Sequence, residues 1–492
     1  MSEGVSKMSS SGSVAQDVSG ADKLTVFTFL WACQALVHQE FYSRWLQNDD
    51  PTGWVVTVLA MAALLRPSAV WLFIGLLISS VVYNVLRWPF VHNHILVETI
   101  ANITILAAFV STFLSTRGDG FHLSRSWRQQ VYDRFAPVLI AMLVMIYYFA
   151  FVAKLNRDFV NPDVSSVIVM YGDLRERFAF LPTPERAGGP AIVLTLIVEA
   201  AIPILLTFRR TRYVGVLLGI PFHLILGLVG HRTFSALAFA MYGLFCMNEL
   251  TRLVTRVQER LSARCSAKGR AAAYYAISAG CVLCVGLLIL ADRTGNYESG
   301  IGPLRFFRIP WAIWILWSLC LGLIFCCCAW MYYRGRTAAS PATVRPGILW
   351  GLVLIVALNG LSQYLGFKTE TSFTMYSNLR TEGSYNNHFF MPAWRLASYQ
   401  DDLVQIEETS IPELKKFTDG DLQITYFELR RILSTTKGDF EIVYLRNGER
   451  YELRRRDNEL AEADVLQPHS ILESKLLYFR PVSTAEHAPH QH

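Results

Sequence analysis

The sequence predicts a mainly α fold: a polytopic helical membrane protein of about 9–11 spans with a small β-rich C-terminal extramembrane domain. The first observation is composition, because 52% of the 492 residues are hydrophobic and only 17% are charged, whereas soluble domains carry roughly 25% charge. The second is that apolar runs near the roughly 20 residues needed to cross a bilayer recur from residue 24 to 365 and not beyond. We therefore predict a tail (1–23), a transmembrane domain (24–365) and an outer domain (366–492).

Eleven apolar runs are candidate membrane spans. The second of them is short and is compatible with a re-entrant segment. The candidates are residues 24–46, 54–65, 68–87, 94–115, 134–153, 191–207, 213–230, 233–248, 271–291, 311–333 and 346–364.

The charges of the connecting loops predict the orientation of the chain, because cytoplasmic loops carry an excess of Lys and Arg. The loops at 116–134, 208–212, 249–270 and 334–345 are rich in arginine, and all four fall on one side of the predicted spans. The alternate loops are balanced or acidic, including the long loop at 154–190. This pattern places the N-terminus in the cytoplasm and the outer domain on the periplasmic face of a bacterial inner membrane, or in an equivalent lumen.

Three features narrow the function further. Residues 1–20 are rich in Ser and Gly and lack the basic start and apolar core of a signal peptide, so they predict a disordered cytoplasmic tail. The net charge of +6 follows from the loop arginines, and we expect no nucleic-acid partner. The CxxC at 281–284 lies in an apolar run without neighbouring His or charged residues, which favours helix packing over a metal or redox site.

Residues 440–455 predict a β-hairpin in the outer domain. Two β-rich runs flank Asn447 and Gly448, and the type I′ turn that joins such strands needs positive φ at both central positions. The other predicted elements of this domain are strands at 422–429 and 474–482, and a short helix at 410–417 with Ser410 as its cap.

Five ionisable residues lie inside or at the ends of the predicted spans, where a charge costs at least about 2.5–3.5 kcal/mol. They are His94, Glu98, Lys154, Glu199 and His223. His94 and Glu98 are spaced i, i+4 and share one helix face. By the predicted orientation, His94 begins its span and Lys154 ends its own span at the same outer face, so the two can lie at equal depth. No acidic residue occupies the turns before Lys154.

Each of these side chains also has a purely structural interpretation. Lys154 can extend its amine to the membrane interface, as lysines at helix ends commonly do, and His94 can cap the start of a helix. His223 can be a buried, hydrogen-bonded histidine. Glu199 is harder to explain in this way, because about ten apolar residues lie on each side of it, so it must be protonated or paired.

Four stretches of the chain, taken in order, resemble a known family. They are "NHILVETI" at 93–100, "YYFAFVAKLNRDF" at 147–159, residues 198–245, and "FKTETSFTMYSNLRTEGSYNNHFFMP" at 367–392. The shared features are a Lys-Leu pair after an aromatic-rich helix, an acid followed by a basic loop, and a Phe-His ahead of a Phe-Ser turn. Over roughly residues 24–392 the chain resembles bacterial members of the vitamin K-dependent γ-glutamyl carboxylase family, the HTTM proteins.

The resemblance implies an enzymatic chemistry for the membrane domain. In this family a membrane lysine is the base that deprotonates a hydroquinone, and the Lys-Leu match assigns this role to Lys154. The family's Asn-His pair matches Asn93 and His94, whose imidazole is then expected to support the lysine. The Phe-His match assigns a contact with the quinone or its oxygenated intermediate to His223. Burial makes a neutral lysine base possible by disfavouring the ammonium form, which agrees with the absence of an acid in the turns before Lys154.

The same resemblance implies the cofactors and partners. They are a reduced vitamin K or menaquinone-type hydroquinone, O2 and CO2, with no metal, and Glu199, Asn93, Glu98 and His223 are expected beside the quinone. Oxygenation of the hydroquinone to its epoxide would supply a strong base that removes a γ-hydrogen from glutamate, after which CO2 adds. The implied partners are membrane lipid, quinone and a Glu-containing peptide or protein. An outer domain of about 125 residues leaves little room for the propeptide-binding region of the animal enzymes, so hydroquinone oxidation alone, or its use on another carbon acid, stays open.

Two functions of other classes also stay open. A transporter or lipid-binding scaffold could hold Lys154 and Glu199 as a static buried pair. Transporters often contain internal inverted repeats or paired Gly/Pro-broken helices, and the sequence shows prolines in neighbouring spans but no repeat. A non-catalytic family member could instead use its outer domain to bind a partner.

Overall fold

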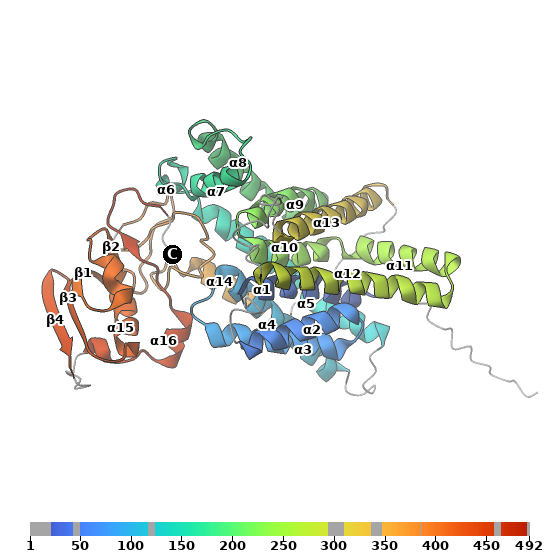
Figure 1. The fold of residues 1–492 in the computed structure, drawn as a ribbon, viewed down its shortest axis with the longest axis horizontal. Coiled ribbons are helices and arrows are strands. Elements are labelled where there is room, and N and C mark those ends of the chain that lie inside the picture. The colour runs from blue at the N-terminus through green and yellow to red at the C-terminus, as the bar shows by residue number, and fades with distance from the viewer. Residues whose placement is uncertain are drawn as a thin grey trace, which may run out of the picture.

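The chain folds into a bundle of helices joined at one end to a smaller domain built on a β-sheet (Figure 1). The computed structural model describes residues 21–42, 50–116, 124–293, 309–335, 347–383, 385–456 and 464–489. The predicted tail at residues 1–20 therefore lies outside the described residues. In the view of Figure 1 the sheet is at the left and the bundle at the right, and the C-terminal end of the chain lies near their junction.

Within the described residues, each of the eleven predicted spans overlaps a helix of the bundle. These helices are α1 (Lys23–Tyr42), α2 (Pro51–Leu65), α3 (Val70–Arg87), α4 (Asn93–Ser115), α5 (Arg125–Ala153), α8 (Pro184–Thr207), α9 (Arg212–Leu228), α10 (Arg232–Phe245), α12 (Ala267–Arg293), α13 (Ile309–Tyr333) and α14 (Trp350–Leu361). Among the described residues, α3, α4, α5, α8 and α13 are long and apolar enough to cross a membrane. The protein is thus a helical membrane protein.

Several helices are longer than their apolar runs, and one predicted loop is helical. Helix α5 begins nine residues before the predicted span at 134–153, where the Ser124 hydroxyl accepts a hydrogen bond from the Trp127 amide. Helix α11 (Met247–Arg264) occupies most of the predicted basic loop at 249–270. The physical reason is that arginine, glutamate and leucine are good helix formers, whereas an apolar run marks only the part of a helix that lies in lipid.

The predicted outer loop at 154–190 also folds into helices. It contains the short α6 (Arg157–Val160) and then α7 (Ser166–Arg177), before α8 begins. The side chain of Asn156 accepts a hydrogen bond from the Phe159 amide and so caps α6. Helix α7 packs on α8, so part of this loop lies against the bundle.

The outer domain contains a five-stranded sheet of order β4-β3-β1-β2-β5. Its strands are β1 (Leu403–Thr409), β2 (Leu422–Thr425), β3 (Phe440–Arg446), β4 (Glu449–Arg455) and β5 (Val482–Ser483). The predicted hairpin is confirmed: β3 and β4 pair in antiparallel register, and φ is 53° at Asn447 and 80° at Gly448.

The other predictions for the outer domain were wrong in part. The strand expected at 422–429 ends at Thr425, because the Thr425 hydroxyl accepts from the Glu428 amide and starts helix α15 (Tyr426–Thr435). Most of 474–482 is the end of α16 (Ile471–Leu476) and extended chain. The short helix forms as the 3₁₀ helix η2 (Pro412–Phe417), and Ser410 does not cap it, since its hydroxyl instead accepts from the Glu441 amide. The domain is therefore mixed α and β.

Residues 366–402 connect the last membrane helix to the sheet and lie between the two parts. The backbone here adopts positive φ at four non-glycine residues within one short stretch, Thr371, Phe373, Tyr376 and Asn378. The Phe373 amide donates a 2.5 Å hydrogen bond to Asn93 Oδ1 at the start of α4. Such left-handed conformations cost energy and persist only where surrounding contacts fix them. Contacts with the bundle therefore hold this connection in one conformation.

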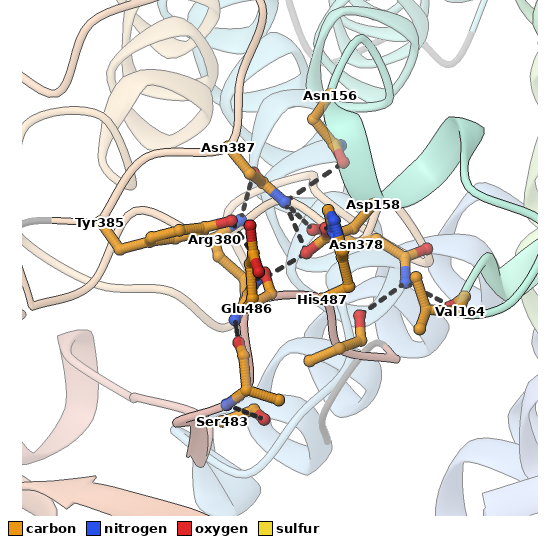
Figure 2. A network of polar contacts seen from close by, with 12 residues as sticks. Asn156, Asp158, Val164, Asn378, Arg380, Tyr385, Asn387, Ser483, Glu486 and His487 are labelled. Carbon is orange, nitrogen blue, oxygen red and sulfur yellow. Dashed lines mark hydrogen bonds and ion pairs between the residues drawn. The ribbon is translucent and has the colours of Figure 1, made fainter.

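A buried polar network fastens the outer domain to the bundle (Figure 2). The Asp158 carboxylate, after α5, accepts from Arg380 Nε at 2.9 Å, from Asn387 Nδ2 at 3.0 Å and from His487 Nδ1 at 2.8 Å. The Arg380 guanidinium also donates to the carbonyls of Ala485 and Glu486 near the C-terminal end. One carboxylate thus joins the membrane domain, the connecting segment and the end of the chain.

Candidate functional site

A cavity of about 690 Å³ lies between the membrane helices and the connecting segment. Its walls come from α4, α5, α7, α8, α9 and α10, and residues of the connecting segment between 369 and 376 also line it. Apolar side chains such as Val198, Leu218 and Phe222 form most of the surface. A volume of this size with mostly apolar walls and a few polar groups is typical of a site for an apolar small molecule.

Lys154 lines this cavity and is buried, although it follows directly after the last residue of α5. Its Nζ lies 2.9 Å from Glu199 Oε2 and donates to the carbonyls of Ala150 and Met375 at 3.2 Å each. The Phe159 ring centroid is 5.9 Å from Nζ. The amine therefore points inward and does not extend to the interface.

Glu199 is the partner that the sequence of α5 does not contain. It lies in the middle of α8, is buried and lines the same cavity. Among the described residues, Lys154 is the one group that pairs with its carboxylate. The predicted need for pairing is met across two helices, so the absence of an acid in the turns before Lys154 does not mean that the lysine lacks an acidic neighbour.

His94 and Asn93 reach the cavity from the first turn of α4. His94 Nε2 lies 2.9 Å from Thr233 Oγ1 at the start of α10, and the His94 ring stacks on His92 with 5.8 Å between centroids. Lys154 and His94 thus both line this cavity, while their equal depth in a membrane stays a prediction.

Glu98 and His223 lie behind the cavity wall rather than in it. One turn below His94, Glu98 faces α1, where it pairs with His38 and accepts a 3.3 Å hydrogen bond from Gln34. The side chain of His223 is fully buried, with Nε2 at 2.5 Å from the Tyr147 hydroxyl and Nδ1 at 3.1 Å from Ser235 Oγ. The spacing from His94 predicted that Glu98 lies near the site, and the family resemblance predicted the same for His223, but the two side chains pack toward α1 and α10 instead.

Tyr147 is the residue that stands between His223 and the cavity. It lines the cavity from α5, two turns before Lys154, and its hydroxyl contacts both His223 and, at 2.5 Å, the Tyr242 hydroxyl. No sequence pattern singles out this tyrosine, because it lies in a run of aromatic residues that is typical of ordinary helix packing. The only signal was its position seven residues, or about two helical turns, before Lys154.

The connecting segment supplies polar groups that the sequence did not identify. Glu370 and Tyr376 line the outer end of the cavity, and the Tyr376 hydroxyl lies 3.2 Å from His231 Nδ1. Burial raises the pKa of Glu370 to about 7, an effect that the nearby Arg480 partly opposes. Burial also raises the pKa of Tyr376 to about 12. Their approach depends on the positive-φ backbone, which a sequence pattern does not reveal.

The geometry allows two kinds of chemistry. A buried ion pair beside an apolar cavity can exchange a proton with a bound hydroxyl group, and it can equally fix two helices together. The cavity itself combines mostly apolar walls with a few ionisable side chains. Comparison with known proteins does not decide between them, because no family model, curated protein or solved structure matches the chain.

Proposed function

We propose that the protein is an integral membrane enzyme similar to the vitamin K-dependent carboxylases, which binds a reduced naphthoquinone in this cavity and promotes its epoxidation by O2. The observation that carries the proposal is the Lys154 and Glu199 pair, buried in the wall of an otherwise apolar cavity. Overall, the hydroquinone and O2 give the epoxide and water. The strong base that this oxidation supplies can be directed at a carbon acid, with γ-carboxylation of glutamate by CO2 as the leading case.

The residues of the cavity have distinct roles in this proposal. The Lys154 and Glu199 pair takes up the proton of the ligand hydroxyl, and the Lys154 side chain faces the oxygen that loses it. His94, fixed by Thr233, and Tyr147, fixed by His223, orient the polar head. The apolar walls exclude water from the reacting atoms, and charged groups interact more strongly where water is excluded.

In this proposal a quinone tail leaves the cavity past two exposed residues of its wall. Leu194 of α8 and Ile225 of α9 line the cavity and are 61% and 47% exposed. An isoprenoid chain that left between these helices would remain in contact with lipid. This arrangement supports a ligand with a polar head and a long apolar tail over a compact polar metabolite.

The proposal includes a topology. We place the chain in a bacterial inner membrane with 9–11 spans, the N-terminus in the cytoplasm and the outer domain in the periplasm. In support, predicted outer loops contact that domain: Lys475 Nζ donates to the Trp88 carbonyl at 2.7 Å, and Met375 O accepts from Lys154. Labelling of single cysteines in intact cells from either side of the membrane tests this orientation.

The function is tested by incubating the purified protein, in detergent or nanodiscs, with menaquinol or vitamin K hydroquinone and O2. We expect wild type to form the epoxide and Lys154→Ala to lose at least about 100-fold in rate, because removal of a proton-transfer group typically costs 10²–10⁴-fold. Labelled CO2 and a Glu-containing peptide then test the carboxylation step. Absence of the epoxide with wild type would reject the proposal.

A scaffold or transporter is the second candidate, and one observation favours it. All three protons of a Lys154 ammonium have an oxygen within hydrogen-bond distance, which is also what a static structural pair needs. In that case the hydroquinone would bind without reaction, or would not bind. The same assay, with binding measured beside turnover, separates this function from the enzymatic one.

A further inference from the structure

Lys154 and Glu199 differ in how completely their hydrogen-bonding groups are used. Nζ of Lys154 has three oxygen neighbours: Glu199 Oε2 at 2.9 Å and the carbonyls of Ala150 and Met375 at 3.2 Å. An ammonium group has three protons to donate, whereas a neutral amine has two and a lone pair. The ion pair with Glu199 and the two accepting carbonyls therefore match the charged form of Lys154.

The position of Lys154 on its helix favours the same form. Ala150 O is one of the last carbonyls of α5, and the C-terminal end of a helix carries partial negative charge that stabilises a cation. The face of the Phe159 ring adds a weaker attraction for a cation. Three separate features of the site thus hold the positive charge on Lys154.

Glu199 has the opposite character. A carboxylate can accept about four hydrogen bonds, yet among the described residues Lys154 is the one partner of Glu199. The side chain also lines the cavity, where a ligand hydroxyl can reach it. The other titratable side chains that line this cavity are His92, His94, Tyr147, Tyr171, His231, Glu370 and Tyr376.

We infer that Glu199 is the group that accepts the proton of the ligand hydroxyl, while Lys154 keeps its three protons and stabilises the resulting oxygen anion. This rests on the proposed function. The O–H bond of the ligand breaks, an O–H bond forms on Glu199, and the electron pair stays on the ligand oxygen. The ammonium changes its partner from one anion to another, so the site carries no net charge before or after the step, as a low-dielectric environment favours.

The two possible proton acceptors, Glu199 and a neutral Lys154, predict opposite effects of the Glu199→Gln substitution on the epoxide rate. Glutamine keeps the shape and an oxygen for Lys154 but accepts no proton at neutral pH. If Glu199 is the acceptor, the epoxide rate should fall at least about 100-fold. If a neutral Lys154 is the acceptor, loss of the neighbouring anion favours the neutral amine, and the rate should be kept or should rise.

Two further variants make this comparison secure. Glu249→Gln is the matched control, because Glu249 is also a buried carboxylate, but it accepts from Tyr213 and lies outside the cavity; we expect wild-type turnover. Glu199→Asp keeps a carboxylate in a shorter side chain and should retain more activity than Glu199→Gln. Each protein is first tested for a monodisperse elution profile and for binding of oxidised menadione, so that a loss of rate is not a loss of folding.

A measurement without turnover completes the test. Infrared difference spectra are recorded without O2 as the wild-type protein binds vitamin K hydroquinone. We expect the band of a protonated carboxyl group to appear on binding in wild type and to be missing in Glu199→Gln. A Glu199-dependent band that is already present before binding would overturn the inference and favour a neutral lysine, as would a Glu199→Gln protein of undiminished rate. If wild type neither binds hydroquinone nor forms epoxide, the proposed function itself fails.

Discussion

Asp158 and Glu199 are both buried carboxylates, but their surroundings differ. Asp158 accepts from an arginine, an asparagine and a histidine. Among the described residues, Glu199 has one partner, Lys154, and its side chain lines a cavity. Buried carboxylates thus serve two purposes in this molecule. A carboxylate that accepts several hydrogen bonds makes a rigid joint, whereas a carboxylate with few hydrogen bonds beside a cavity can react with a ligand.

The largest expected effect is on the joint. Replacement of Asp158 by Ala leaves the Arg380 guanidinium buried beside Asn387 without its anion, and removal of one member of a buried pair typically costs about 3–5 kcal/mol. We expect the free energy of unfolding to fall by this amount in chemical denaturation of the purified protein. Asp401→Ala is the control, since its pair with Arg395 is partly exposed and is worth about 1 kcal/mol or less. Equal effects of the two variants would refute the distinction.

The next effect concerns the pair in the cavity wall. Lys154→Met and Glu199→Leu each leave one buried charge unpaired, so each alone should destabilise the protein by about 3 kcal/mol. The double variant removes both charges, and its loss should be smaller than the sum by about 1–3 kcal/mol. Unfolding measurements on all four proteins give this coupling energy. Strictly additive losses would mean that the ion pair does not form in the folded protein.

Glu370 combines features of Glu199 and Asp158, because it lines the cavity and also has an arginine, Arg480, nearby. Its pKa is raised from 4.5 to about 7 in the folded protein, so the folded state binds more protons than the unfolded state between these values. Stability from this group is therefore lost as pH rises through that window. Relative to Glu370→Gln, wild type should become less stable between pH 4.5 and 7, by at most about 1.4 kcal/mol per pH unit. A pH-independent difference between the two proteins would contradict this assignment.

The smallest effect is expected where a single donor is removed from the joint. The His487 side chain is 44% exposed, and without it Asp158 keeps its bonds to Arg380 and Asn387. His487→Ala should therefore lower the free energy of unfolding by about 0.5–1 kcal/mol. The comparison is with Asp158→Ala under identical conditions. A loss as large as that of Asp158→Ala would show that the histidine, rather than the arginine, secures the joint.

Sequence reasoning succeeded where a residue type is rare for its surroundings. Lys154, Glu199 and His94 stand out in apolar runs, and the structure places all three around one cavity. Sequence reasoning failed where the partner of a buried side chain comes from another helix. The four-residue spacing that put Glu98 near His94 could not show that α1 would supply His38 as its partner.

Some features of the fold could likewise be predicted from the sequence, and others could not. The Asn447–Gly448 turn could be predicted because its backbone conformation selects those residues. The change from strand β2 to helix α15 depends on one hydroxyl, that of Thr425, and the approach of Glu370 to the cavity depends on a left-handed backbone at Thr371 and its neighbours. Periodicity and composition do not encode either feature.

The most direct test of the account is epoxide formation from vitamin K hydroquinone and O2 by the purified protein, with wild type and Lys154→Ala compared at equal concentration. The account predicts measurable epoxide with wild type and a rate at least about 100-fold lower with Lys154→Ala, since the variant removes the positive charge that faces the ligand oxygen. A wild-type protein that binds the hydroquinone but forms no epoxide, or a Lys154→Ala protein of undiminished rate, would contradict it.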